Sequence, residues 1–217
     1  MRDAMSKIHL EILDETRKAA WKKLSPFVRQ GYLAGGTALA LQINHRKSVD
    51  FDIFINKAVD NRLHRKVEKI FGKNDYYVNT GDQISFTTRD GIGITFVWCY
   101  YKLLYPVVHT SSLPLASVYD IAADKAHTIG RRAVWRDYVD FFILLKWKIV
   151  TIATIIELAQ KKFGGEFSET QFLQQLSYFD DLRQMPIEFL KDSYTTGEIK
   201  AFLEREVANY LKKILPV

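Results

Sequence analysis

Residues 31–56, GYLAGGTALALQINHRKSVDFDIFIN, decide the fold that the sequence predicts. An apolar stretch precedes Gly35-Gly36-Thr37, and a short apolar helix is expected over residues 38–43. A basic turn that includes Arg46 then leads to a strand predicted over residues 48–55. The order is therefore a strand, a glycine turn, a short helix and a second strand.

The second strand separates its side chains onto two faces, because successive residues of a strand point in opposite directions. One face is apolar and is expected to point into a core; it carries Val49, Phe51 and Ile53. The other face carries Ser48, Asp50 and Asp52. Two carboxylates so placed can hold Mg²⁺, which keeps several waters and takes further ligands from substrate phosphates.

The glycine turn suits a phosphate group. Gly35 and Gly36 have no Cβ, so their backbone can come close to an anion. The N-terminus of the following helix offers free N–H groups to the same anion. These features predict a site for Mg²⁺–NTP, and the alternative is a structural turn before a solvated edge strand.

A second set of charged residues lies within residues 117–148, SVYDIAADKAHTIGRRAVWRDYVDFFILLKWK. Helical periodicity places Lys125 on a partly apolar side of its helix, an unusual position for a solvated lysine. Arg131 follows near the end of that helix. In the next helix, Asp137 and Asp140 are three residues apart and share a face.

The two motifs together resemble those of the AbiEii/AbiGii toxin family of nucleotidyltransferases. Residues 33–54 carry the first motif, and the second is carried by Lys125, Arg131 and the run Arg136-Asp137-Tyr138-Val139-Asp140. The resemblance implies a nucleotidyltransferase fold, an NTP as substrate and Mg²⁺ as cofactor. It also implies a toxin of an abortive-infection or toxin–antitoxin system, with a separately encoded antitoxin as partner.

The resemblance further implies that the second motif lines the nucleotide cleft opposite the two strand aspartates. The residues expected to be catalytic are Asp50, Asp52, Lys125 and Asp140, with Asp50 and Asp52 as metal ligands. Those expected to bind the nucleotide are Gly35, Gly36, Thr37, Arg46, Ser48, Arg131 and Asp137. Lys125 can meet the triphosphate as a point charge, and Arg131 can grip a phosphate with its planar fork. Asp140 can orient Lys125 or act as a general base.

Four of these residues have a second interpretation. Lys125 and Asp140 can form a salt bridge between helices, and Asp137 can interact with the free N–H groups of a helix start. Ser48 can bind terminal phosphates or hydrogen-bond the neighbouring backbone. Ser48 can also accept a phosphoryl or nucleotidyl group, whose charge would repel an incoming triphosphate.

The third strand departs from the family pattern. Residues 92–101, IGITFVWCYY, form a nearly continuous apolar run that predicts a central strand buried on both faces. Nucleotidyltransferases often carry a further carboxylate here, and this chain offers Thr95. The departure argues against a full two-metal mechanism. A catalytically reduced protein that binds a nucleotide or a partner without turnover is therefore the alternative function.

The length, composition and charge of the chain limit the remaining possibilities for its class and function. The chain has 217 residues, a net charge of +6 and one cysteine, which excludes an internal disulfide or a cysteine-based zinc cluster. A basic surface suits nucleotides or RNA, and RNA, tRNA in particular, is the expected acceptor, with a protein side chain as the alternative. A charged N-terminus and the lack of a long apolar run predict a cytoplasmic protein with no membrane span.

The predicted fold class is α/β (α+β), with a small mixed sheet of the nucleotidyltransferase type and flanking helices. A helical bundle is expected to follow, and the two lobes are predicted as residues 1–113 and 114–217. The helix over residues 59–72 has a basic outer face, which is either solvated or an RNA contact. That face comprises Arg62, His64, Arg65, Lys66 and Lys69.

Overall fold

The computed structural model describes residues 7–132, 134–180, 182–183 and 185–215. It divides into two compact units, Met1–Ser117 and Val118–Val217. The division lies C-terminal to the predicted one after residue 113, because the chain pairs with the sheet edge before it leaves the first unit. Leu33 N–H donates to the Pro114 carbonyl (2.8 Å), and Ala116 N–H donates to the Leu33 carbonyl (2.9 Å).

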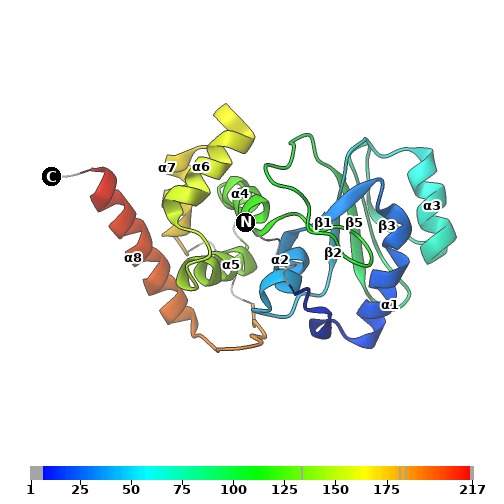
Figure 1. Cartoon of the computed structure of the whole chain (residues 1–217), viewed down its shortest axis with the longest axis horizontal. Coiled ribbons are helices and arrows are strands. Elements are labelled where there is room, and N and C mark those ends of the chain that lie inside the picture. Colours follow the sequence, from blue (N-terminus) through cyan, green and yellow to red (C-terminus); the bar gives the residue numbers. More distant parts are fainter. Residues whose placement is uncertain (1–6, 133, 181, 184, 216–217) are drawn as a thin grey trace. The chain divides into compact units, whose positions relative to one another are not determined.

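The first unit is built on a sheet of five strands among the described residues, in the order β1-β2-β5-β4-β3 (Figure 1). The β2–β5 pair is parallel, and the β1–β2, β5–β4 and β4–β3 pairs are antiparallel. The strands are β1 (Gly31–Ala34), β2 (Phe51–Ile55), β3 (Tyr76–Asn79), β4 (Gln83–Thr87) and β5 (Gly93–Trp98). The helices are η1 (Leu10–Ile12), α1 (Glu15–Lys23), η2 (Ser25–Phe27), α2 (Gly35–Ile43) and α3 (Asn61–Phe71). This mixed sheet with flanking helices confirms the predicted fold class.

Aromatic contacts fill the core between one face of the sheet and the helices on it. Trp21 of α1 stacks on Phe51 of β2 with ring centroids 6.0 Å apart. Phe27 lies 4.9 Å from Phe96 of β5. Phe71 at the end of α3 lies 5.8 Å from Phe86 of β4. These large apolar side chains contribute to the burial that holds the sheet to its helices.

Three predictions about the opening segment need correction. The strand begins at Phe51 and not at residue 48, because its pairing begins there, with Phe51 against Ile94 of β5 and Asp52 against Ala34 of β1. Val49 consequently lies outside the strand and is 37% exposed, whereas Phe51 and Ile53 are buried as predicted. Helix α2 starts at Gly35, earlier than residue 38.

Strand β5 is central in the sheet but is not buried on both faces. Ile94 and Phe96 are buried, whereas Thr95 and Val97 on the opposite face remain partly exposed. The run of apolar and aromatic residues therefore overstated the burial of this strand.

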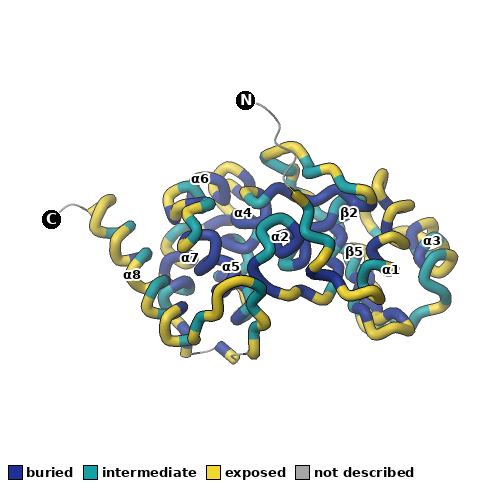
Figure 2. The backbone as a smooth tube through the Cα atoms, turned by 60° about the horizontal axis from the view of Figure 1, so that its bottom comes forward, coloured by how far each residue is buried: buried dark blue, intermediate teal, exposed yellow. Residues whose placement is uncertain are grey.

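The second unit is helical. It contains α4 (Val118–Ile129), α5 (Trp135–Lys146), α6 (Ile152–Phe163), η3 (Gly164–Glu166), α7 (Glu169–Leu176) and α8 (Thr196–Ile214). Helix α5 is buried along most of its length, whereas α8 presents a largely exposed side (Figure 2). Ser168 and Thr195 cap α7 and α8 with side-chain oxygens, which satisfies N–H groups that a helix start leaves open. Within the described ranges, no helix combines the length and apolar character that a membrane crossing requires.

Candidate active site

The glycine turn and the second strand meet at Asp52. Gly35 has a φ of +67°, a conformation that side-chain-bearing residues rarely adopt. A Cβ built on Gly35 would lie 2.8 Å from Asp52 Oδ2. The carboxylate of Asp52 therefore packs directly against the backbone of the turn, and a glycine is required there on two independent grounds.

Asp50 is backed by a second glycine, from strand β5. The parallel register pairs Phe51 with Ile94, which places Asp50 beside Gly93. A Cβ on Gly93 would lie 2.6 Å from Asp50 Oδ1. Both aspartates thus rest on backbone that has no side chain, and both are only partly buried. Each aspartate therefore keeps part of its surface exposed, with its carboxylate close to the backbone of one glycine.

Arg46 is enclosed next to the same turn. It is 2% exposed and is among the largest fully buried side chains of the described chain. Its Nη1 donates to the Lys47 carbonyl (3.0 Å), and a Cβ on Gly36 would lie 2.6 Å from its Nη2. The sequence predicted a basic turn open to phosphates, but only Lys47 of that turn is exposed. Arg46 instead places a buried positive charge behind the glycine turn.

Thr37 and Ser48 join α2 to the segment before β2. The Thr37 hydroxyl donates to the Asp50 carbonyl and shares a 2.8 Å hydrogen bond with Ser48 Oγ. Both side chains are buried, with 1% and 8% exposure respectively. This geometry favours a structural role for Ser48, because its hydroxyl is bonded to Thr37, whose own hydroxyl holds the backbone of Asp50.

The donor set fits Mg²⁺ brought by a nucleotide better than a resident cluster. In the described residues, no group of three or more His, Cys, Asp or Glu side chains is placed to hold a metal. Thr95 pairs with Asp52 in the sheet, so a hydroxyl lies where a third carboxylate would extend the pair, and it contacts Ser85 Oγ at 3.0 Å. Mg²⁺ commonly uses one or two carboxylates together with waters and substrate phosphates, and Asp50 and Asp52 meet that requirement.

The second unit holds an ion-pair cluster around Lys125. Its Nζ lies 2.5 Å from Asp137 Oδ1 and 2.8 Å from Asp140 Oδ2. All three side chains are buried. Asp137 Oδ2 has no hydrogen-bond partner within the described structure, and Arg132 Nη2 approaches it to 3.9 Å. The salt bridge between helices is therefore present, and Asp137 belongs to it as well as to the first turn of α5.

A neighbouring cluster on α4 was not predicted. Lys162 of α6 lies 3.0 Å from Asp120 Oδ1 and 2.7 Å from Asp124 Oδ1. Burial lowers the pKa of Lys162, but Asp124 and Asp120 raise it by more, so the pKa lies above its usual value. Burial raises the pKa of the Asp124 carboxyl by more than Lys162 lowers it. The i, i+4 spacing of Asp120 and Asp124 was the available signal, because such residues share a helix face.

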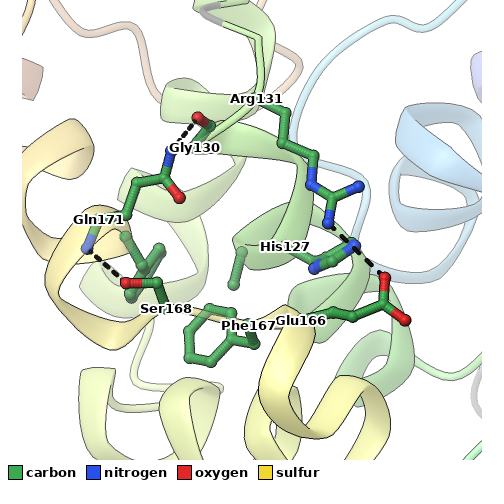
Figure 3. Close-up of a pocket in the computed structure, with 9 residues that line it drawn as sticks. His127, Gly130, Arg131, Glu166, Phe167, Ser168 and Gln171 are labelled. Atoms are coloured by element: carbon green, nitrogen blue, oxygen red, sulfur yellow. Dashed lines mark hydrogen bonds and ion pairs between the residues drawn. The ribbon is translucent and has the colours of Figure 1, made fainter.

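Arg131 lies beside a pocket in the second unit (Figure 3). Its Nη2 is 3.8 Å from Glu166 Oε2, and both side chains are more than half exposed. Gln171 closes one side of the pocket by donating to the Gly130 carbonyl (2.6 Å). His127 stacks on Phe163 with ring centroids 4.0 Å apart; burial and then Arg131 lower its pKa. The role of Arg131 in gripping a phosphate stays a prediction, as does the position of Lys125 opposite the two strand aspartates.

Solved structures of known proteins share this fold. MenT4, a nucleotidyltransferase toxin of Mycobacterium tuberculosis H37Rv, superimposes with a TM-score of 0.62 at 16% identity, covering 89% of this chain and 80% of its own. A candidate nucleotidyltransferase of H. pylori gives a TM-score of 0.57 at 16% identity, covering 94% of this chain and all of its own. The fold is that of the nucleotidyltransferases.

The sequence comparisons are more specific. An uncharacterised protein of Aquifex aeolicus (strain VF5) is 30% identical over 187 residues, which cover 83% of this chain and 88% of the relative. The family model described as nucleotidyl transferase AbiEii toxin, type IV toxin–antitoxin system, matches residues 82–216. The chain belongs to this AbiEii family of nucleotidyltransferase toxins, as the motifs predicted.

Proposed function

We propose that the protein transfers a nucleotidyl group from Mg²⁺–NTP to an acceptor. The observation that carries the proposal is the packing of Asp52 against Gly35 and of Asp50 against Gly93. Two partly exposed aspartates whose carboxylates pack against glycine backbone can bind the metal ion of a metal-bound triphosphate. The peptide groups of the turn and the N-terminus of α2 supply hydrogen-bond donors for its phosphate oxygens.

The reaction proceeds by attack of an acceptor oxygen on the α-phosphorus. A new P–O bond forms, the bond between the α-phosphorus and the bridging oxygen breaks, and pyrophosphate leaves while the acceptor proton passes to water. Asp50 and Asp52 would hold Mg²⁺, which would neutralise negative charge on the triphosphate. Through that metal, Asp50 and Asp52 would position the triphosphate, and the buried guanidinium of Arg46 would stabilise negative charge near the glycine turn.

Lys125 contributes the positive charge of the second motif in this proposal. Asp137 and Asp140 hold its amine in one position, so it can meet a phosphate without further ordering. Asp140 is fully buried and paired with Lys125, which favours an orienting role over that of a general base. Arg131 is exposed enough to exchange Glu166 for a phosphate.

The proposed biological setting is a toxin–antitoxin or phage-defence system in which RNA, tRNA in particular, is the acceptor. The support is the membership of the AbiEii family and the net charge of +6. A separately encoded antitoxin is the proposed protein partner, and the cytoplasm is the proposed compartment. The alternative is nucleotide or partner binding without turnover, which Thr95 in place of a third carboxylate favours.

The test compares the wild-type protein with Asp52→Asn. The wild type should transfer label from α-labelled NTP to total RNA in the presence of Mg²⁺, and Asp52→Asn should not, although it should keep its circular dichroism spectrum. Asp90→Asn is the matched control, because Asp90 is an exposed aspartate in the turn before β5. Unchanged transfer by Asp52→Asn contradicts the assignment, and nucleotide binding by the wild type without any transfer selects the alternative.

A further inference from the structure

Helix α3 has one apolar side and one cationic side. Leu63 and Val67 are buried beneath it. At 100° per residue, Arg62 and Lys69 point in nearly the same direction, and Arg65 lies about 60° from Arg62. All three are exposed. We call Arg62, Arg65 and Lys69 the cationic stripe of α3, which is the cyan helix in Figure 1.

Lys66 does not belong to this stripe, although it lies on the same helix. Its Nζ donates to the Pro26 carbonyl and to Gln30 Oε1, both at 2.7 Å, and it lies 4.8 Å from the centre of the Phe27 ring. Burial lowers its pKa. Lys66 therefore fixes α3 to the segment before β1, and the orientation of the stripe is set by internal contacts.

The stripe is not neutralised within the described part of the chain, where none of its three side chains has a salt-bridge or hydrogen-bond partner. Helix α1 differs, since Arg17 pairs with Asp14 and Lys18 with Glu15. Glu68 is the exposed acidic residue within α3 and lies on the far side of Arg65 from the other two cations.

We infer that the cationic stripe binds the phosphate backbone of a polynucleotide. Arg62 and Lys69 are separated by about 10 Å along the helix axis, and roughly six phosphate charges occur over that length of duplex. An interface with a protein would need apolar or aromatic side chains at its centre, and Leu63 and Val67 are turned inward instead. The inference extends the proposed function by giving the acceptor a surface, but it concerns binding and not transfer.

The test measures the affinity for a short fluorescein-labelled RNA by anisotropy, without NTP, over a range of salt concentrations. The variant is Arg62→Gln, Arg65→Gln and Lys69→Gln combined. Loss of three phosphate contacts should reduce the magnitude of the salt slope by about 2 to 3 and weaken binding roughly 10²-fold at 0.1 M salt. The control changes three exposed lysines of the second unit to glutamine, which lowers the net charge equally; these are Lys161, Lys212 and Lys213.

An unchanged salt slope in the stripe variant overturns the inference. So does an equal loss of affinity in the control, which would mean that only the net charge matters. Binding of polyglutamate as tightly as RNA would assign the stripe to an acidic protein and also overturn it. Because binding is measured without NTP and without transfer, a failure of the proposed transfer reaction is distinguishable from a failure of this inference.

Discussion

Gly35→Ala separates the two reasons for a glycine in the turn. The φ of +67° makes alanine unfavourable by about 1–2 kcal/mol, whatever surrounds it. For a chain of this size, that corresponds to a decrease in Tm of about 2–8 °C. This part of the effect concerns the stability of the fold alone.

The second reason is contact with the carboxylate. The new Cβ would lie 2.8 Å from Asp52 Oδ2, and ordinary contact begins at 3.4 Å, so the carboxylate must retreat by the difference, about 0.6 Å. Misplacement of a catalytic group by about 1 Å can reduce a rate by about 10²-fold. We therefore expect Gly35→Ala to lower the transfer rate by roughly 10- to 100-fold, which corresponds to about 1.4–2.7 kcal/mol of transition-state stabilisation.

Gly91→Ala is the matched control. Gly91 has a φ of +77°, but a Cβ there would meet no atom within 4 Å. Both variants should lose similar stability in thermal melts, and only Gly35→Ala should lose activity and affinity for Mg²⁺–NTP. Wild-type transfer by Gly35→Ala, or an equal loss of activity in both variants, would refute the reasoning about Asp52.

Three further predictions concern buried charge and the third strand. Lys125→Met should lower the free energy of unfolding by about 3–5 kcal/mol, because Asp137 and Asp140 stay buried without their cation; a urea melt measures this, and an unchanged midpoint contradicts it. Lys162→Met should lower the free energy of unfolding by about the same amount at neutral pH. The folded-state pKa of Lys162 is raised above its unfolded value of 10.5, so the stabilisation is full below pH 10.5 and the difference from wild type should shrink as pH rises through the folded pKa. A difference in unfolding free energy between Lys162→Met and the wild type that grows at alkaline pH would contradict this prediction. Thr95→Asp should tighten Mg²⁺ binding, measured by calorimetry, because it adds a carboxylate beside Asp52; weaker binding would show that the site has no room for a third acid.

Much of the first unit could be predicted from its sequence because local chemistry dominates there. The alternation around Phe51 and Ile53 predicted a half-buried strand, and the burial of both residues confirms it. The glycine turn and the aspartate pair were adjacent enough in the chain to suggest one site. The alternation could not predict the residue at which β2 begins, because that depends on where its pairing with β5 and β1 begins.

The sequence could not predict which backbone segments pack against the carboxylates of Asp50 and Asp52. Gly93 looked like an ordinary residue of an apolar run, and its contact with Asp50 depends on the parallel register between β2 and β5. Arg46 looked like part of a basic turn that draws in phosphates, and its burial depends on its packing against Gly36 of α2. Tertiary contacts between distant segments decide both cases.

The ion pairs of the second unit show which part of a charge network can be predicted from the sequence. Asp120 and Asp124 are four residues apart and differ by about 40° around α4, so they face one neighbour, while Lys125 lies about 100° further round and faces another. Two lysines on different helices can therefore each meet two aspartates without exchanging partners. The sequence spacing predicts the two faces of α4. It does not predict that α6 packs against one face and α5 against the other, because that depends on how the helices pack. It is this packing that holds Lys125 against Asp137 and Asp140.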